Sequence, residues 1–404
     1  MARRRSSRGA GRQRAAGRPA GSTAAPRPPR GRLVALALAS VVLTLGALEL
    51  GVRAYYAISG VPPIVSFGST SEEWEQRWID RHRDQGLEVY YGFDQYNPIY
   101  GWSIRPNLRA YQFGSLPPVT TNAEGWRSRH DYAHARQPGV GRIAVLGDSF
   151  TFGEQAHDDD VWTVDLERQL DHTEVYNFGV HGFGTDQQLL VLEHDALAYH
   201  PDIVVLGFFV EDILRNGLSF RDYAKPMFVL KNGALVLTDS PVPPPERVLA
   251  EASGVRPWSD LLHFVRTRLT GAIDGANLDD VVDDQGLSSL THAILERMQR
   301  DVAAAGAKLL VVIIPSRRAM PRVEEALGAW AGEIGYTAVN VGPALDAAEK
   351  AYGKSMYTDF YHSALGDLVM SAEVRRTLVD RGWVAAPSPE TLARFDARLR
   401  EAAK

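Results

Sequence analysis

The second half of the chain alternates between apolar runs and helix-like segments, as a parallel α/β fold does. Apolar runs predict five strands, at 143–146, 174–177, 203–209, 308–314 and 337–341. Segments with helical spacing lie between and after them, at 160–170, 186–199, 288–305, 321–334 and 365–381. The pattern predicts one α/β domain over residues 141–385.

Because crossovers between parallel strands are right-handed, few topologies remain for such a chain. We expect a three-layer sandwich around a five-stranded parallel sheet in flavodoxin-like order. Between the third and fourth strands lies an insertion at about 214–284, too long for a structureless loop. It contains a predicted hairpin, 227–230 and 234–237, joined through Asn232-Gly233, and a helix-like stretch at 258–269. The insertion leaves the sheet at its carboxyl edge, so it is either a specificity element or lid, or a packing insert without a ligand role.

The first sixty residues have a different character. Residues 1–32 hold ten arginines and no acid, which predicts a disordered basic tail. Residues 33–52 form an apolar run near the roughly 20 residues needed to span a bilayer. The arginine excess predicts a cytoplasmic N-terminus and an extracytoplasmic remainder, in the cell envelope of a bacterium. A cleaved signal peptide is the alternative, and it too places the globular part outside.

Residues 53–90 mix aromatic and charged side chains and predict a juxtamembrane stalk. Residues 91–135 are rich in Asn, Pro, Gly and aromatics and predict a small β-rich leader. A helical tail is expected over 386–404.

The amino-acid composition excludes several classes of function. The net charge of −5 and the lack of a basic face on the globular part argue against nucleic acid as a partner. The absence of cysteine excludes disulfides, thiolate metal sites and cysteine nucleophiles. No sequence feature calls for a cofactor or a metal.

The candidate chemistry begins where the first strand of the domain ends, at Gly147-Asp148-Ser149-Phe150. In open α/β sheets, ligands bind beyond the carboxyl ends of the strands. A serine at this turn is lifted from the core, beside the free N–H groups of the next helix. Ser149 is therefore a candidate nucleophile, or else an ordinary N-cap.

A nucleophilic serine needs a base and a group that orients the base. Thr358-Asp359-Phe360-Tyr361-His362 precedes the last helix of the domain. If this segment is a helical turn, the spacing of three places Asp359 and His362 on one side. The alternative is that Asp359 caps the final helix and His362 has no role.

The two motifs together, Gly147-Asp148-Ser149-Phe150 and Asp359-Phe360-Tyr361-His362, resemble those of the SGNH (GDSL-like) serine hydrolases, and the resemblance covers about residues 141–383. The leader is also similar to that of membrane-anchored bacterial members. The resemblance implies that Ser149 is the nucleophile, His362 the general base and acid, and Asp359 the residue that orients His362.

The resemblance also implies an oxyanion site formed by the backbone N–H of Ser149, a glycine after the second strand and an asparagine after the third. Gly182 fits the glycine best, with Gly179 as the alternative. The asparagine position holds Glu211, followed by Asp212. Glu211 donates to an oxyanion only when protonated. Otherwise the missing donor costs on the order of 10²- to 10³-fold in rate, Asn216 substitutes for it, or activity is lost or changed.

Two other clusters of charged residues are candidates for a binding site. His157-Asp158-Asp159-Asp160 precedes a helix and is assigned to its N-terminal dipole rather than to a metal. Arg317 and Arg318 follow the fourth strand and are candidates for binding an anionic substrate.

The sequence predicts a serine esterase anchored by a single N-terminal membrane helix. It would act through an acyl-enzyme on an ester-bearing small molecule or envelope polymer, such as an O-acetylated glycan or a lipid. An O-acyltransferase for an envelope polysaccharide and a catalytically silent glycan-binding module are the alternatives, and Glu211 favours the latter.

Overall fold

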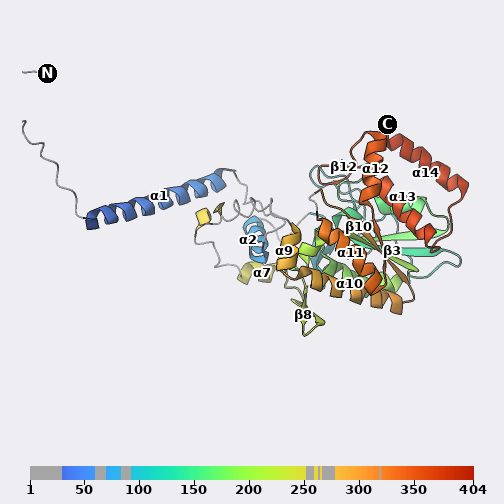
Figure 1. Cartoon of the computed structure of the whole chain (residues 1–404), viewed down its shortest axis with the longest axis horizontal. Coiled ribbons are helices and arrows are strands. Elements are labelled where there is room, and N and C mark those ends of the chain that lie inside the picture. The colour runs from blue at the N-terminus through green and yellow to red at the C-terminus, as the bar shows by residue number, and fades with distance from the viewer. Residues whose placement is uncertain are drawn as a thin grey trace, which may run out of the picture.

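The computed structural model describes residues 30–59, 70–82, 92–251, 259–262, 264–265, 278–317 and 320–404. A long helix near the N-terminus projects away from an α/β body that contains the sheet and most of the other described helices (Figure 1).

The body is built around five parallel strands whose order in the sheet is β11-β10-β5-β3-β4. Their bounds are β3 Gly141–Gly147, β4 Thr173–Gly179, β5 Ile203–Phe209, β10 Lys308–Ile314 and β11 Thr337–Asn340. Numbered along the chain, these strands have the flavodoxin-like order 2-1-3-4-5, so the predicted fold class is confirmed. Every residue of the central strand β5 is buried, as expected of a strand covered on both faces.

Alternate side chains of each strand enter two separate cores, which gives the three layers. Ala144 and Leu146 pack into one core, while Ile143 and Val145 pack into the other. The first core is covered by α5 Thr185–His194, α10 Leu287–Ala304 and α11 Pro321–Ile334. The second is covered by α4 Trp162–Arg168, α12 Gly342–Tyr352 and α13 Ala364–Asp380. The helix predicted over 186–199 is divided into α5 and a short 3₁₀ helix, η1 Ala196–Tyr199.

The leader packs on the domain through aromatic side chains. It contains an antiparallel hairpin of β1 Asp94–Asn97 and β2 Gly101–Ile104, followed by two isolated bridges, Tyr111 with Val119 and Thr121 with Arg127. Tyr132 stacks on Tyr176 of β4 with ring centroids 4.1 Å apart, and the Trp126 ring lies 4.8 Å from that of Phe178. The leader therefore shares the first core with the sheet.

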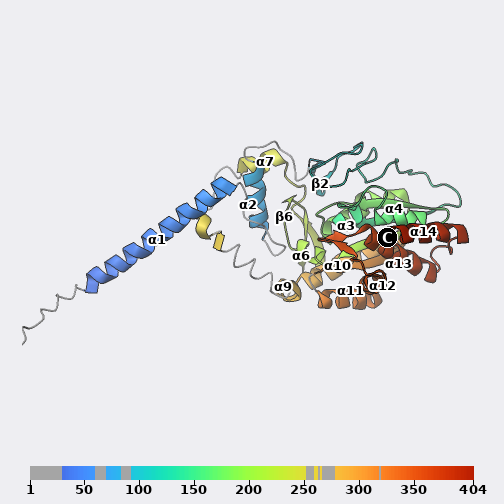
Figure 2. The same cartoon turned by 90° about the horizontal axis from the view of Figure 1, so that it is seen from above.

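The insertion contains the predicted hairpin, observed as β8 Met227–Lys231 and β9 Ala234–Thr238. It also holds α6 Asp212–Arg215, β6 Phe220–Arg221, β7 Tyr223–Ala224, α7 Pro245–Glu251 and α9 Leu278–Asp284. Half of the helix expected over 258–269 lies outside the described residues. Helix α2 Ser71–His82, in the segment expected to be a stalk, packs on the insertion, with the Trp78 ring 5.1 Å from Tyr223. Figure 2 shows α2 and α7 between the long N-terminal helix and the body.

Helix α1 Arg30–Ser59 is long and apolar enough to cross a membrane. Its apolar stretch, Gly31–Tyr55, has 25 residues and a mean hydropathy of 2.3. Glu49 is the one acid in this stretch. Its carboxylate accepts hydrogen bonds from the Ser259 hydroxyl and from the N–H groups of Asp260 and Leu261, so the insertion touches α1.

The C-terminal helix α14 Pro389–Ala402 contacts α4 through a partly buried ion pair. Arg398 Nε donates to Asp165 Oδ1 at 2.8 Å. Burial raises the pKa of Asp165 to about 6, although the nearby arginines oppose the shift. The folded protein therefore binds this proton more tightly than the unfolded chain, in which the pKa of an aspartate is about 3.9.

Asp165 thus predicts a pH dependence of stability. Because the pKa is raised on folding, its contribution to the free energy of unfolding falls as pH rises from about 4 to about 6, by about 3 kcal/mol. In urea unfolding, we expect the free energy of unfolding of the Asp165→Asn variant to fall less than that of the wild type between pH 4.5 and 7. If the free energy of unfolding changes by the same amount between these two pH values in the variant and in the wild type, Asp165 does not titrate in this window.

Candidate active site

Ser149 is the first residue of α3 Ser149–Phe152, the short helix that follows β3. Asp148 caps this helix, since its Oδ1 accepts from Phe150 N at 2.9 Å. The Ser149 hydroxyl lies 3.3 Å from the other carboxylate oxygen, Asp148 Oδ2. Asp148, rather than Ser149, is thus the helix cap. This leaves the serine hydroxyl for other chemistry.

The turn is tight enough to require glycine before it. A Cβ added at Gly147 would lie 2.1 Å from Thr151 Oγ1 and 3.0 Å from the Gly207 carbonyl oxygen. The chain therefore passes from β3 into α3 with the backbone packed against β5. This packing holds Ser149 just beyond the carboxyl edge of the sheet, where only 3% of the residue is exposed.

His362 lines the same cavity as Ser149. It belongs to the two-residue strand β13 Tyr361–His362, which pairs with β12 Tyr357–Thr358. Both Ser149 and His362 line one small cavity of about 10 Å³, together with Phe150, Gly153, Glu154, Gln155, Ala156, Tyr361 and Asp367. The volume within this cavity is about that of one water molecule.

The structure does not place Asp359 against His362, and the orienting role of Asp359 stays a prediction. The segment is a β-hairpin and not a helical turn, so the spacing of three does not place the two side chains on one side. Asp359 occupies the turn with φ of 52°, and its residue is exposed. Its carbonyl oxygen accepts from Arg317 Nη1 at 2.9 Å.

Asp367 is the carboxylate that the structure places against His362. It lies in the first turn of α13, and its Oδ1 is 3.4 Å from His362 Nδ1. Both residues are 6% exposed, and burial raises the pKa of the Asp367 carboxyl. The contact has ion-pair distance without good hydrogen-bond geometry, as is common in sites without substrate. Ser149, His362 and Asp367 therefore line the same cavity.

Tyr361, next to His362 on β13, ties the hairpin to the loop after α3. Its hydroxyl lies 3.0 Å from Glu154 Oε2 and is within hydrogen-bond reach of Ser149. Burial and the Glu154 carboxylate raise the pKa of Tyr361 well above its usual value. The hydroxyl therefore stays protonated and donates to Glu154.

Three more of the predicted residues, Gly182, Glu211 and Asn216, come after other strands at the same edge of the sheet. Gly182, after β4, has a φ of 77°, and its N–H makes no hydrogen bond within the described part of the chain. Gly179 N–H, by contrast, already donates to Asn177 Oδ1 at 2.8 Å. Gly182 is therefore the better candidate for an oxyanion donor, and that role stays a prediction.

Glu211, after β5, is fully buried and precedes α6. The Ser316 hydroxyl donates to its Oε1, so Glu211 acts here as an acceptor. Asn216, the proposed substitute donor, is committed elsewhere: its Nδ2 donates to Thr291 Oγ1 at 2.9 Å, and its Oδ1 accepts from Asp186 N.

We therefore expect the Glu211→Gln variant to hydrolyse a chromogenic acetyl ester about ten times faster than the wild type. The substitution keeps the shape but replaces an acceptor with an amide that donates, and one such donor is worth on the order of 10²- to 10³-fold in other enzymes. Steady-state kinetics of the two proteins checks this. A large fall in kcat would instead show that the carboxylate has a role of its own.

Sequence reasoning missed a buried arginine behind the nucleophile. Arg215 Nη1 donates to Asp148 Oδ2 at 2.9 Å and to Asp212 Oδ1 at 2.6 Å. It also donates to the Phe183 carbonyl. Burial and the Asp148 charge raise the pKa of Asp212 well above its usual value. Arg215 therefore fixes the carboxylate that caps α3 and contacts the Ser149 hydroxyl.

The remaining predicted residues lie apart from this cavity. Arg317 is exposed, and its guanidinium carbon lies 5.8 Å from the Tyr357 ring centroid. Its substrate-binding role stays a prediction, while Arg318 lies outside the described residues. The acids after His157 form ion pairs: Asp158 with Arg127, Asp159 with Arg129 and Arg168, and Asp160 with Arg398. Among the described residues, no group of three His, Asp or Glu side chains is placed to hold a metal.

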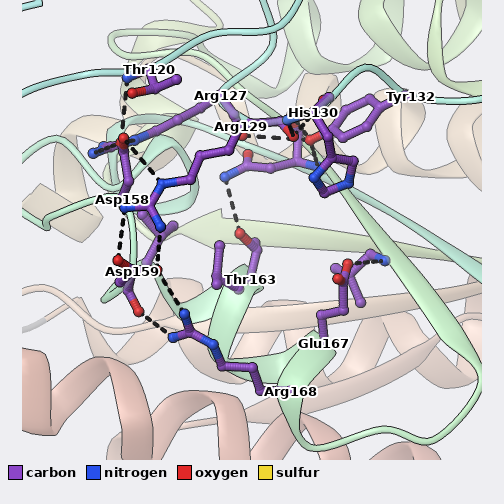
Figure 3. Close-up of a pocket in the computed structure, with 15 residues that line it drawn as sticks. Thr120, Arg127, Arg129, His130, Tyr132, Asp158, Asp159, Thr163, Glu167 and Arg168 are labelled. Atoms are coloured by element: carbon purple, nitrogen blue, oxygen red, sulfur yellow. Dashed lines mark hydrogen bonds and ion pairs between the residues drawn. The ribbon is translucent and has the colours of Figure 1, made fainter. Parts of the chain in front are cut away.

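A larger cavity of about 250 Å³ lies between the leader and α4. Figure 3 shows its wall of arginines and acids, in which Arg127, Arg129 and Arg168 reach Asp158 and Asp159. Ser149 and His362 do not line it. The candidate residues Ser149 and His362 therefore line the small cavity and not the larger one.

No protein-family model and no curated protein matches the sequence. Solved structures similar to this chain include a member of the lipolytic protein G-D-S-L family from Veillonella parvula DSM 2008, with 12% identity and a TM-score of 0.35 over 59% of this chain and 99% of that one. A lipase/acylhydrolase from Enterococcus faecalis has 14% identity and a TM-score of 0.35 over 62% of this chain and all of that one. A catalytic mutant of an acetylxylan esterase from Geobacillus stearothermophilus has 13% identity and a TM-score of 0.35, covering 59% of this chain and 95% of that one.

Proposed function

We propose that the chain is a serine esterase that acts through an acyl-enzyme, in the manner of the SGNH hydrolases that its motifs resemble. The observation that carries the proposal is the cavity at the carboxyl edge of the sheet, which Ser149, His362 and Asp367 line together. These residues come from three separate elements, α3, β13 and α13, and they have the chemistry of a nucleophile, a base and an orienting carboxylate.

In the proposed mechanism, Ser149 Oγ attacks the ester carbonyl while His362 takes its proton. The tetrahedral intermediate places its negative oxygen near the N–H groups of Ser149 and Gly182. His362, held by Asp367, then gives the proton to the departing alcohol oxygen, which leaves the acyl group on Ser149. A water molecule, deprotonated by His362, attacks this acyl-enzyme, and the carboxylic acid leaves as Ser149 regains its proton.

We also propose that α1 anchors the esterase outside the cytoplasm. The basic tail before the helix favours a cytoplasmic N-terminus. The contacts of Glu49 with Ser259, Asp260 and Leu261 support a helix that is retained, since a cleaved one would leave them unmade. An enzyme held at this place meets envelope glycans and lipids, so an O-acetyl ester on an envelope polymer is the proposed substrate class.

The experiment that tests this function uses the full chain in detergent micelles. We expect release of nitrophenol from 4-nitrophenyl acetate, and release of acetate from an O-acetylated polysaccharide, both lost after treatment with a fluorophosphonate. Acetate transfer to an added deacetylated glycan, in place of release, would indicate an acyltransferase. A folded protein that neither turns over the esters nor reacts with the fluorophosphonate would contradict both the esterase and the acyltransferase. That result would favour the catalytically silent module.

A further inference from the structure

One arginine of the leader lies directly behind the catalytic turn. Arg127 is 5% exposed, and its guanidinium donates to the backbone of the segment that follows Ser149. Nη1 donates to the carbonyl oxygens of Phe152, at 3.0 Å, and of Gly153. Nη2 donates to the Ala156 carbonyl oxygen at 2.7 Å.

The charge of Arg127 is balanced by the same segment. Asp158 Oδ1 lies 3.1 Å from Nη2 and 3.3 Å from Nε. A guanidinium presents several donors in a fixed plane, so it holds more acceptors in one geometry than a lysine ammonium does. Figure 3 shows Arg127 and Asp158 side by side at the wall of the larger cavity. The loop of residues 153–158 is therefore fastened to the leader at both of its ends.

The other side of this loop forms a wall of the Ser149 cavity. Gly153, Glu154, Gln155 and Ala156 all line that cavity. Glu154 is 8% exposed, and its Oε2 accepts from the Tyr361 hydroxyl at 3.0 Å. Tyr361 and His362 are consecutive residues of β13. A continuous set of contacts therefore runs from Arg127 through the loop and Tyr361 to the proposed base.

We propose that Arg127 is a positioning residue for the Ser149 site: it holds the loop so that Glu154 fixes Tyr361, and with it His362, against the nucleophile. The inference rests on the proposed esterase function. It makes the leader a working part of the active site, because the catalytic turn is supported by a residue that lies outside the α/β domain in sequence.

The test is a double-mutant cycle on the full chain. Arg127→Met is expected to lower kcat/KM for 4-nitrophenyl acetate about 100-fold, mainly through kcat, and Arg127→Lys is expected to retain about a tenth of wild-type activity. Arg129→Met is the matched control, since Arg129 is a half-exposed neighbour that pairs with Asp159, and we expect wild-type rates from it. Glu154→Ala is expected to cost about tenfold in the wild type but less than twofold in the Arg127→Met background, because coupled residues are not additive.

Additive effects of Arg127→Met and Glu154→Ala would overturn the proposal, because they would mean that Arg127 acts by general stabilisation alone. Hydrogen exchange supplies a readout that does not depend on activity. Arg127→Met is expected to accelerate amide exchange in residues 153–158 more than in β3, whereas equal acceleration throughout the domain would also overturn the proposal. If the wild type neither turns over esters nor labels at Ser149, the proposed function fails, while the exchange result still decides the role of Arg127 in holding the loop.

Discussion

Replacing His362 with alanine is expected to lower kcat/KM for an acetyl ester by about 10⁴- to 10⁶-fold, the range in which removal of a triad base falls in other serine hydrolases. The reason is that Ser149 then has no group to take its proton. The other carboxylates near it, Asp148 and Glu154, are held by Arg215 and Tyr361. Steady-state kinetics of the purified full chain, with circular dichroism to check the fold, measures the effect.

The control for this prediction is His157→Ala. His157 is an exposed histidine in the loop after α3 and lies outside the Ser149 cavity. We expect it to keep wild-type kinetics. Equal losses in the two variants would mean that the loss does not come from a specific base, and full activity without the His362 imidazole would contradict the assignment of His362.

Replacing Asp367 with asparagine is expected to lower kcat about 10³-fold or more while KM changes little. An asparagine cannot favour the His362 tautomer that leaves Nε2 free to accept the serine proton, and it does not stabilise the imidazolium that forms. Asp359→Asn is the matched variant, because it makes the same chemical change in the residue that the motif suggests. We expect Asp359→Asn to keep at least half of the wild-type kcat.

The opposite ranking would contradict the structure. If Asp359→Asn is the damaging variant, the hairpin must rearrange in solution so that Asp359 reaches His362, and the 3.4 Å contact with Asp367 would not matter for the reaction. Equal losses in both variants would mean that the two carboxylates share the role.

The fold could be predicted because the apolar runs of the sequence correspond to the buried strands of the sheet. Strands at 203–209 and 308–314 were predicted with the observed bounds, since apart from Lys308 at the start of the second strand every residue in them is buried and none is charged. Helix α12 was missed, although Pro343 stands in its first turn and marks a helix start. It is short, and Leu345 and Ala348 are its only fully buried apolar side chains among the described residues, so its periodicity is weak.

Within the candidate site, Ser149 and His362 could be proposed from the sequence because each lies in a recognisable motif at the end of a strand or just before a helix. The contact of Asp367 with His362 could not be predicted, because it depends on how the hairpin of β12 and β13 turns, which a spacing of residues does not determine. One signal was available: Ser363 caps α13 at Gly366 N, which places Asp367 in the first helical turn, five residues after His362. The contacts of Arg127 with the loop after α3 and of Arg215 with Asp148 could not be inferred, because these partners are distant in sequence.

The measurement that tests the central claim most directly is the site of fluorophosphonate labelling. The full chain in detergent is treated with the probe, digested and sequenced by mass spectrometry. We expect one modified residue, Ser149, and loss of labelling in Ser149→Ala, while Ser128→Ala labels as the wild type does. Labelling at another residue, or none at all in well-folded protein, would contradict a nucleophile at the end of β3.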